Sequence, residues 1–343
     1  MINAYISGTG MYVPPRSVTN DDLRTVYGID TTHDWIVQRT GIEARRFAEE
    51  GVGSSEMASY AAKQALEDAK LTARDLDMIL FATLSPDMCF PGSGPLLQQR
   101  LGLLEGDEPK FVPTMDIRNQ CSGFVYGLAT AASMVRAGGA KHVLVVGAET
   151  HSAALDLTTR GRTVATIFGD GAGAVVVSGT EEDRGIRKWF LGADGRYADA
   201  LKQPIWDIKK RPYIKVNEEG AGVIPPEMLW PQMDGKAVFK NAVERMCGAV
   251  VEMCFDQNVT TDQIDLFCFH QANMRINQFV ADQLGIPQSK LVHNIHKYGN
   301  TTAATIPLLL AEAQRDGKLK RGMKVAIVAF GAGFTWGSML VDW

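Results

Sequence analysis

Residues 71–81 read LTARDLDMILF, and residues 259–269 read VTTDQIDLFCF. Each stretch begins with a polar turn and ends in an apolar run, which is typical of a strand buried in a sheet that is covered on both faces. Residues 137–146 and 318–328 form a second such pair, in which a basic, glycine-containing turn leads into an apolar run. Both pairs fall in the same order of predicted helices and strands. The sequence therefore predicts an α/β protein built from a duplicated unit, with halves that meet near residue 180.

This division gives an N-terminal half of residues 1–178 and a C-terminal half of residues 179–343. A chain of 343 residues has the length of two domains or of one large α/β unit. Residues 194–235 differ from their surroundings, because they are rich in proline, contain two tryptophans and show little periodicity. We interpret them as an excursion inserted in the C-terminal half that forms a lid or a pocket wall.

The composition, with 45% hydrophobic and 22% charged residues, is that of a globular protein. A net charge of −4 predicts no broad basic face, so we expect no nucleic-acid partner. The five cysteines contain no C-x-x-C pair, which argues against a disulfide framework and for a reducing compartment. No histidine lies in a cluster of metal ligands, and residues 1–8 resemble neither a signal peptide nor a membrane span. We therefore expect a cytoplasmic protein without a metal.

One cysteine lies where a predicted strand turns into a predicted helix. The run 119–127, NQCSGFVYG, follows the extended run 110–117 and leads into a helical run over 124–137, so Cys121 stands at a helix N-terminus. The free N–H groups and the dipole of such a terminus favour an anion, and a thiol there ionises more easily. The residues thus predict either a nucleophile or, alternatively, an inert cysteine in a tight junction.

The repeat supplies two partners for this cysteine. The strand over 265–269 ends at His270, and Asn300 precedes an Ala-rich helix in the part of the second half that corresponds to the Cys121 turn. Functional groups in such sheets lie at the carboxyl ends of the strands. If the halves pack about a pseudo-two-fold axis, Cys121, His270 and Asn300 converge. Taken singly, the histidine is a strand-end residue and the asparagine is a turn residue.

Two further motifs have an alternative structural interpretation. Trp35 and Arg39 lie one helical turn apart and could present a flat, cationic platform, or they could be a half-buried Trp beside a solvated Arg. The glycine-rich run 170–173 matches neither nucleotide-binding motif and precedes a strand, so its glycines indicate close backbone packing.

Six motifs extend over nearly the whole chain: 35–42 (WIVQRTGI), 121–124 (CSGF), 168–174 (FGDGAGA), 270–276 (HQANMRI), 299–304 (GNTTAA) and 330–338 (FGAGFTWGS). On these motifs the chain resembles the 3-oxoacyl-ACP synthase III family of the thiolase superfamily, the initiating condensing enzymes of type II fatty-acid synthesis. The resemblance implies the thiolase fold, in which two duplicated α/β halves form five layers, α-β-α-β-α, around a pseudo-two-fold axis.

The resemblance also implies an acyltransferase that works without a cofactor. Cys121 would take an acyl group from acyl-CoA, and malonyl-ACP would lose carbon dioxide to give an enolate held by His270 and Asn300. The backbone N–H groups of Cys121 and Ala332 would form the oxyanion hole. Ala332 stands where the family usually has glycine.

Binding residues follow from the same resemblance. Those implied for CoA are Trp35, Arg39, Gly235, Phe239, Asn273 and either Arg160 or Arg162, because this chain has two arginines where the family usually has one. Lys240 and Arg275 would face the acyl carrier protein, and Phe90, Phe168 and Phe330 would line the acyl pocket. Phe90 would reach into the pocket of a second subunit, which implies a homodimer.

Other readings of the catalytic residues remain. The same three groups serve enzymes that condense two acyl-CoAs, and enzymes of this fold that transfer an acyl group to form an ester or an amide. A thiolase would need a second cysteine in the turn 331–333, which has none. The chain order Cys, His, Asn is also that of papain-like proteases, but the residues around Cys121 lack their pattern.

Overall fold

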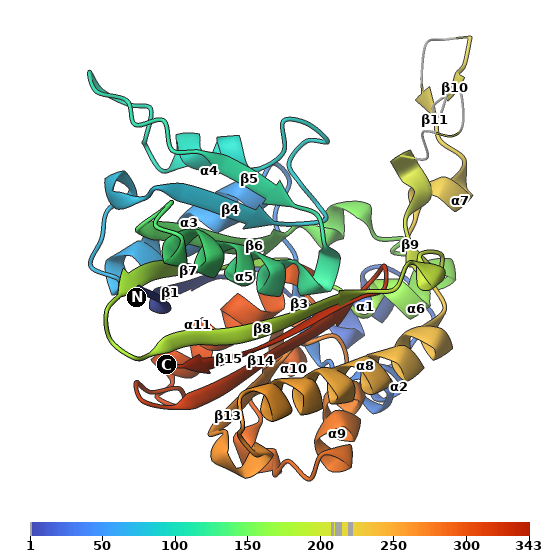
Figure 1. The fold of residues 1–343 in the computed structure, drawn as a ribbon. Coiled ribbons are helices and arrows are strands. Elements are labelled where there is room, and N and C mark those ends of the chain that lie inside the picture. Colours follow the sequence, from blue (N-terminus) through green and yellow to red (C-terminus); the bar gives the residue numbers. More distant parts are fainter. Residues whose placement is uncertain (1, 207–208, 210–214, 219–221) are drawn as a thin grey trace.

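Two sheets form the centre of the computed structural model, which describes residues 2–206, 209, 215–218 and 222–343 (Figure 1). In the described residues, the N-terminal sheet has the strand order β1-β7-β6-β4-β5 and the C-terminal sheet has the order β13-β14-β15-β8. The first sheet comprises β1 (Asn3–Tyr12), β4 (Met78–Ala82), β5 (Thr114–Ile117), β6 (His142–Glu149) and β7 (Gly171–Thr180). The second comprises β8 (Gly185–Ala193), β13 (Leu266–Phe269), β14 (Lys324–Gly331) and β15 (Thr335–Asp342).

The two sheets repeat one pattern of strand directions. In the first, β4 is parallel to β6, β6 is antiparallel to β7, and β7 is antiparallel to β1. In the second, β13 is parallel to β14, β14 is antiparallel to β15, and β15 is antiparallel to β8. A single parallel bridge from Phe267 to Leu291 takes the place that β5 has beside β4. The predicted duplication is therefore confirmed, and it includes the strands in residues 71–81 and 259–269.

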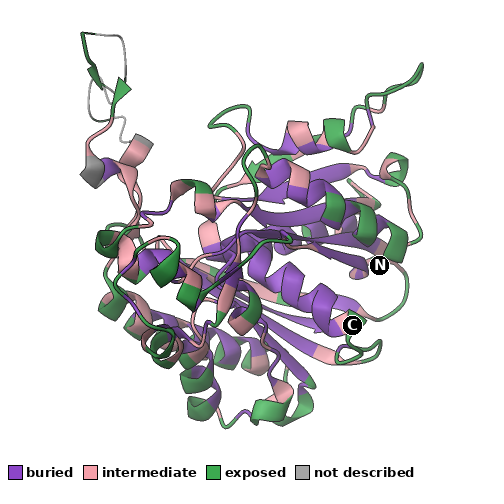
Figure 2. Ribbon diagram, turned by 180° about the vertical axis from the view of Figure 1, so that it is seen from behind, coloured by how far each residue is buried: buried purple, intermediate pink, exposed green. Residues whose placement is uncertain are grey.

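In the part of the chain that the structure describes, five long helices complete the layers. They are α3 (Ser54–Asp68), α5 (Gly123–Arg136), α8 (Gly235–Asp256), α9 (Met274–Gln283) and α11 (Thr305–Arg315). Helices α5 and α11 lie between the sheets, α3 covers the outer face of the first sheet, and α8 and α9 cover the outer face of the second (Figure 1). On β6, Val143 and Val145 face the shared core while Leu144 and Val146 face α3. The expected α-β-α-β-α architecture is thus present, with its purple interior enclosed by green surface in Figure 2.

Shorter helices and strands surround the two sheets and the five long helices. The helices are α1 (Asn20–Thr25), α2 (His33–Thr40), α4 (Gly94–Arg100), α6 (Arg162–Ala165), α7 (Pro226–Leu229) and α10 (Ile295–Tyr298). The strands are β2 (Ser17–Thr19), β3 (Ala44–Arg46), β9 (Leu201–Lys202), β10 (Lys215–Val216), β11 (Gly222–Val223) and β12 (Gln232–Met233). Within the excursion 194–235, β9 pairs with β12 beside the body of the molecule, and β10 and β11 extend away from it (Figure 1).

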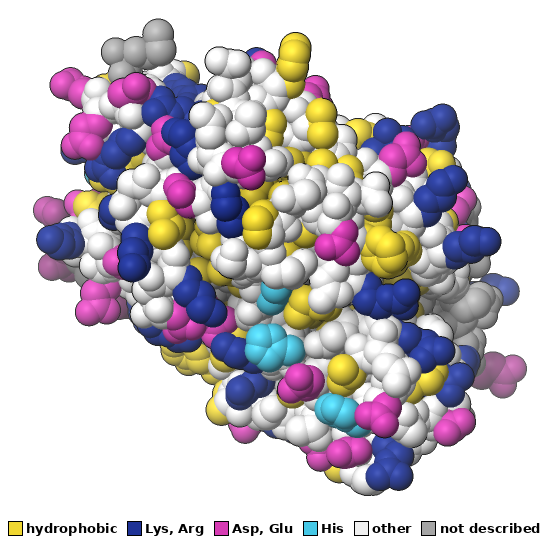
Figure 3. All heavy atoms as spheres, turned by 90° about the horizontal axis from the view of Figure 1, so that it is seen from below, with side chains coloured by type: hydrophobic (Ala, Val, Ile, Leu, Met, Phe, Trp, Pro, Cys, Tyr) yellow, Lys and Arg dark blue, Asp and Glu magenta, His cyan; other side chains and the backbone are white. Residues whose placement is uncertain are grey.

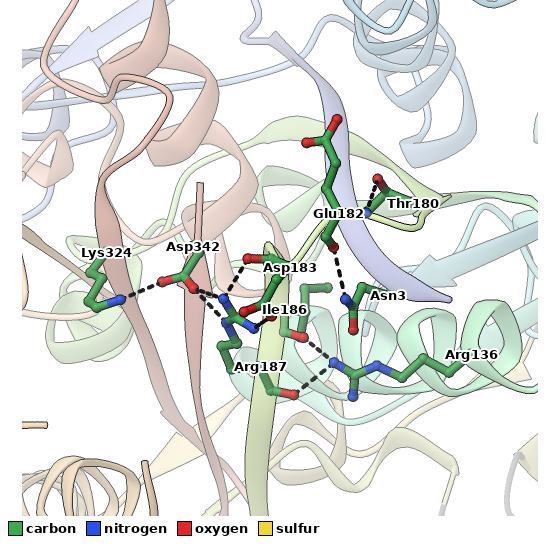
Figure 4. A network of polar contacts seen from close by, with 9 residues as sticks. All are labelled: Asn3, Arg136, Thr180, Glu182, Asp183, Ile186, Arg187, Lys324 and Asp342. Atoms are coloured by element: carbon green, nitrogen blue, oxygen red, sulfur yellow. Dashed lines mark hydrogen bonds and ion pairs between the residues drawn. The ribbon is translucent and has the colours of Figure 1, made fainter. Parts of the chain in front are cut away.

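A network of hydrogen bonds and ion pairs connects the two halves where they meet (Figure 4). Arg136 on α5 donates to the carbonyl oxygens of Ile186 and Arg187 at the start of β8. The Arg187 guanidinium pairs with Asp342, which also accepts from Lys324 Nζ at 3.0 Å. Because β7 ends at Thr180 and β8 begins at Gly185, we propose the division within residues 181–184, slightly beyond the predicted residue 178.

The surface carries both signs of charge. On the face shown in Figure 3, Lys and Arg side chains are interspersed with Asp and Glu side chains. This mixture agrees with the net charge of −4.

Candidate active site

Cys121 lies at a strained turn that occurs in both halves. It is the middle residue of a 3₁₀ turn, Gln120–Ser122, that opens α5, and Gln120 has a φ of 44°. The turn Thr302–Ala304 opens α11 in the same way, and Thr302 has a φ of 49°. Left-handed backbone at a residue other than glycine costs about 1–3 kcal/mol and is concentrated at functional sites. Both turns are therefore held in place by their surroundings.

Groups from three elements meet at the Cys121 sulfur. The backbone N–H groups of Ala332 and of Cys121 itself, and the Thr302 hydroxyl, make hydrogen bonds that favour the thiolate. The carboxyl end of β14 comes so close that a Cβ on Gly331 would lie 2.8 Å from Cys121 Cβ. Only glycine permits this approach, which brings the N–H of Ala332 to the sulfur.

The enclosure of Cys121 opposes ionisation. Burial, together with the nearby Glu149 carboxylate, raises the pKa of the Cys121 thiol to about 12, although the three hydrogen bonds lower it. The sequence predicted a thiol that ionises more easily, and burial acts in the opposite direction. Loss of the thiol proton therefore has to accompany attack on a substrate, and the groups that favour the thiolate determine how readily that happens.

His270 and Asn300 are also buried, and one side-chain atom of each makes a hydrogen bond within the protein. His270 directly follows β13, and its Nδ1 lies 2.6 Å from Thr305 Oγ1, while among the described residues its buried Nε2 has no partner. Burial lowers the pKa of His270 to about 3, so the ring is neutral at physiological pH. Asn300 Oδ1 accepts from the Thr302 N–H at 2.7 Å. Since the oxygen is engaged, the amide N–H groups are the donors that Asn300 can offer to a substrate.

Thr302 interacts with Cys121 and Asn300 and is connected to His270 through Thr305. Its hydroxyl faces the Cys121 sulfur, its N–H binds Asn300, and its carbonyl accepts from Thr305, which in turn contacts His270. Sequence reasoning did not single out Thr302. Its position in the second half, equivalent to Gln120 beside the nucleophile, was the feature that could have identified it.

A cavity of about 710 Å³ opens onto this site. Cys121, Thr302, Ala332 and Phe168 line it, whereas His270 and Asn300 are not among its lining residues. The excursion contributes Leu201, Lys202, Gln203, Ile205 and Pro231 to the wall, as a pocket-wall role predicts. Phe330, expected in the acyl pocket, instead packs in the core with its ring 4.8 Å from that of Phe334. It is excluded from the cavity because it lies on a β14 face covered by α8 and α9.

Four of the residues expected to bind CoA lie together around α2: Trp35, Arg39, Arg162 and Asn273. The guanidinium groups of Arg39 and Arg162 lie 4.3 Å and 5.2 Å from the centre of the Trp35 ring. Asn273 Nδ2 donates to the Arg39 carbonyl oxygen at 3.0 Å. Arg160 instead pairs with Asp156 at 2.6 Å. The structure therefore associates Arg162, rather than Arg160, with the Trp35 platform.

A second group of expected binding residues lies on α8 and α9. Gly235 begins α8, where the Asp234 side chain caps the helix. Phe239 packs edge-to-face on Phe279 at 5.6 Å, and Arg275 lies 5.9 Å from the Phe239 ring. The exposed Lys240 follows Phe239 on the same helix. Phe90 lies apart from both groups, in the loop after β4, and is 84% exposed.

The described ranges hold neither a cluster of metal ligands nor a membrane-spanning helix. No three His, Cys, Asp or Glu side chains in them gather as a metal site would require. The helices there are too short or too polar for one to cross a bilayer.

In the glycine-rich run after Phe168, the Asp170 carboxylate accepts from the N–H groups of Ala48 and Ser152. This run thus holds loops together.

Known proteins match this chain over its full length. Family models described as 3-oxoacyl-[acyl-carrier-protein] synthase III and as its C-terminal part match residues 115–195 and 254–343. The β-ketoacyl-[acyl-carrier-protein] synthase III 1 of Halalkalibacterium halodurans is 40% identical over 100% of this chain and 99% of its own. The chain belongs to the 3-oxoacyl-[acyl-carrier-protein] synthase III family. The synthase III of Neisseria gonorrhoeae is likewise 40% identical over 99% of both chains.

Solved structures of the family agree with the fold. The crystal structure of 3-oxoacyl-[acyl-carrier-protein] synthase III from Aquifex aeolicus is similar with a TM-score of 0.86, at 38% identity, over 99% of this chain and 100% of that one. As a member of this synthase III family, the chain is a condensing acyltransferase of fatty-acid biosynthesis with the thiolase fold.

Proposed function

We propose that this synthase condenses an acyl group, taken from acyl-CoA, with malonyl-ACP to give 3-oxoacyl-ACP. The observation that carries the proposal is the placement of Cys121 beside the Ala332 N–H in a cavity, with Asn300 and His270 joined to it through Thr302 and Thr305. Family membership supports the reaction class, and this geometry supports the assignment of roles.

In the first half-reaction, Cys121 Sγ attacks the thioester carbonyl of acyl-CoA. The C–S bond to CoA breaks, the thiol proton leaves with the CoA sulfur, and the acyl group remains on Cys121. The developing oxyanion is held by the N–H groups of Cys121 and Ala332, and one such donor contributes about 3–4 kcal/mol to lowering the barrier.

In the second half-reaction, malonyl-ACP loses carbon dioxide and becomes an enolate thioester. The enolate oxygen is held by an amide N–H of Asn300 and by Nε2–H of His270. This role requires the His270 proton on Nε2, so the Thr305 hydroxyl has to turn its single proton from the Thr302 carbonyl oxygen, 3.0 Å away, to His270 Nδ1. The enolate carbon then attacks the acyl-Cys121 carbonyl, and collapse of the adduct releases 3-oxoacyl-ACP and returns the Cys121 thiolate.

Substrate entry and assembly complete the proposal. Trp35, Arg39 and Arg162 form the platform for the CoA nucleotide, while Lys240 and Arg275 on α8 and α9 contact the acidic carrier protein. Phe90 enters the pocket of a second subunit in a homodimer. Support for a dimer comes from β5, an edge strand of the described sheet, on which Met115 is exposed near the exposed Phe111. A cytoplasmic location fits an enzyme with these substrates.

Intact mass spectrometry after incubation with a graded series of acyl-CoAs tests the proposal. We expect an acyl adduct on the wild type and none on Cys121→Ala; an equal adduct on both would refute the role of Cys121. Malonyl-ACP or a second acyl-CoA is then added, and the product is identified. Carbon–carbon bond formation with the second acyl-CoA alone would replace malonyl-ACP as the proposed partner.

A further inference from the structure

His151 is a buried histidine close to the nucleophile for which the proposed reaction has no role. It lies two residues after the end of β6, and its Nε2 is 2.7 Å from Thr302 Oγ1. Its ring packs on Phe168 with the centroids 4.7 Å apart. The apolar contact and the hydrogen bond together fix the ring, so that Nε2 faces the hydroxyl that itself faces Cys121.

The Thr302 hydroxyl has a single proton for two neighbours. It can donate to His151 Nε2, or it can accept from Nε2–H and donate to the Cys121 sulfur. Burial lowers the pKa of His151 to about 3, so the ring is neutral and carries one N–H. A sulfur that becomes negative during acyl transfer can only accept, and a hydrogen bond to a charged acceptor is roughly twice as strong as a neutral one. The second arrangement is therefore favoured as charge develops.

We propose that His151 Nε2–H donates to the Thr302 hydroxyl, which in turn donates to the Cys121 sulfur and favours the thiolate. In this chain of two hydrogen bonds each bond polarises the next. Thr302 touches the reacting atom, and His151 is a positioning residue that directs the Thr302 proton. No proton is transferred along the chain. The inference rests on the proposed role of Cys121 as the nucleophile.

The other ionisable groups around the sulfur differ in their effect on the thiolate. From β6, the Glu149 carboxylate disfavours the thiolate. From the end of β13, His270 is neutral and supplies no compensating charge. Arg118, which precedes the Cys121 turn, lines the same cavity. In this environment, hydrogen bonds from the Thr302 hydroxyl and from backbone N–H groups oppose both burial and Glu149.

The rate of Cys121 alkylation by iodoacetamide, followed at the level of the Cys121 peptide between about pH 7 and 10, tests the chain. Thr302→Val removes the hydrogen bond to the Cys121 thiolate, and His151→Leu removes the donor that directs it. Since a hydrogen bond to a charged group is lost or weakened, we expect each variant to slow alkylation about tenfold at fixed pH. Thr302→Ser and His151→Gln retain a donor in place and should restore most of the rate. Thermal unfolding of each variant shows whether it is folded.

Two results would overturn the inference. One is alkylation of folded His151→Leu at the wild-type rate throughout the pH range. The other is a ¹⁵N NMR spectrum of the wild type in which His151 carries its proton on Nδ1, because the Thr302 proton would then point to the ring. Acylation of Cys121 by acyl-CoA is measured in parallel. The wild type can be acylated normally by acyl-CoA while His151→Leu is alkylated at the wild-type rate. In that case the proposed hydrogen bonds from His151 through Thr302 to Cys121 are refuted, and the proposed function stands.

Discussion

The backbone N–H of Thr302 donates to Asn300 Oδ1 over 2.7 Å, within one turn of the chain. The backbone of Asn300 is fixed as well, since its N–H donates to the Ile167 carbonyl at 2.9 Å and its carbonyl accepts from Gly169 at 3.1 Å. The Asn300 amide can therefore rotate little, and its N–H groups are held ready for a substrate oxygen. Such preorganised donors lower barriers because they need no rearrangement during reaction.

Replacing Asn300 by Ala should separate the two half-reactions. The variant loses a donor to the enolate, so we expect condensation to fall by about 10²–10³-fold. Acylation of Cys121 uses other donors and should continue. CoA release from acyl-CoA and carbon dioxide release from malonyl-ACP are measured on the same sample, so that the first serves as the control. Equal loss of both activities would show that Asn300 acts on the structure of the site rather than on the enolate.

Gly331 offers a test of the close approach between β14 and the nucleophile. A Cβ there would lie 2.8 Å from Cys121 Cβ and 2.9 Å from its backbone nitrogen, and neither atom can move freely. We expect Gly331→Ala to displace Cys121, to slow acylation about 10²-fold and to destabilise the fold by about 1–3 kcal/mol.

Gly248 in α8 is the matched control, because an added Cβ would have nothing within 4 Å. Gly248→Ala should leave acylation unchanged and stabilise the helix by about 0.5–1 kcal/mol. Chemical denaturation and the rate of adduct formation are measured for both variants. A Gly331→Ala protein that is acylated at the wild-type rate would contradict the proposed packing.

The sequence predicted those features that depend on order along the chain. The apolar runs ending at Phe81 and Phe269 indicated equivalent strands, and these lie at equivalent places in the two sheets. The same order led to His270 and Asn300 as partners of Cys121. What the sequence could not provide was side-chain geometry at the meeting of the halves. Nothing in the local pattern of Thr302 indicates that its hydroxyl lies between a cysteine and a histidine from the other half.

Burial was the second property that the sequence could not supply. A helix N-terminus alone predicted an easily ionised Cys121, but the enclosure of the sulfur by β14 and the turn at Thr302 raises its pKa instead. Likewise, Phe330 shares a motif with Ala332, yet the alternation of side chains along a strand directs it into the core beneath α8 and α9. Which face a strand residue occupies depends on packing partners far away in the chain.

Arg160 and Arg162, which precede the Phe168 turn, should differ in their contribution to the binding of acyl-CoA. Arg162 lies over the Trp35 ring, whereas Arg160 is paired with Asp156. A cation over an aromatic ring contributes about 0.5–2 kcal/mol, so Arg162→Ala should raise the KM for acyl-CoA roughly tenfold with little change in kcat. Arg160→Ala should change KM less than about twofold, because the Arg160 guanidinium is paired with Asp156 and not with the Trp35 ring. The reverse order of the two effects would assign CoA binding to Arg160.

Glu149 provides a prediction for pH. Its buried carboxylate accepts from the Thr83 hydroxyl at 3.1 Å, from the backbone N–H groups of Leu84 and Ser85, and from the Ala303 N–H at 3.4 Å. It therefore joins the loop after β4 to the turn that carries Thr302. Burial nevertheless raises the pKa of Glu149 from its ordinary value of 4.5 to about 7. The folded protein thus binds a proton here that the unfolded chain releases.

The sign of the effect follows from this difference in proton binding. The contribution of Glu149 to the free energy of unfolding is fully present below about pH 4.5 and is lost as the pH rises through 7. Glu149→Gln should remove this loss, so the difference in stability between wild type and variant should change between pH 5 and 8 and be constant above. The variant also lacks the charge that raises the pKa of Cys121, and its Cys121 should therefore alkylate faster at pH 8. Denaturant unfolding across the pH series measures the change in stability, and the alkylation rate measures the change at Cys121. A stability difference between wild type and variant that is constant from pH 5 to 8 would show that Glu149 is ionised throughout this range.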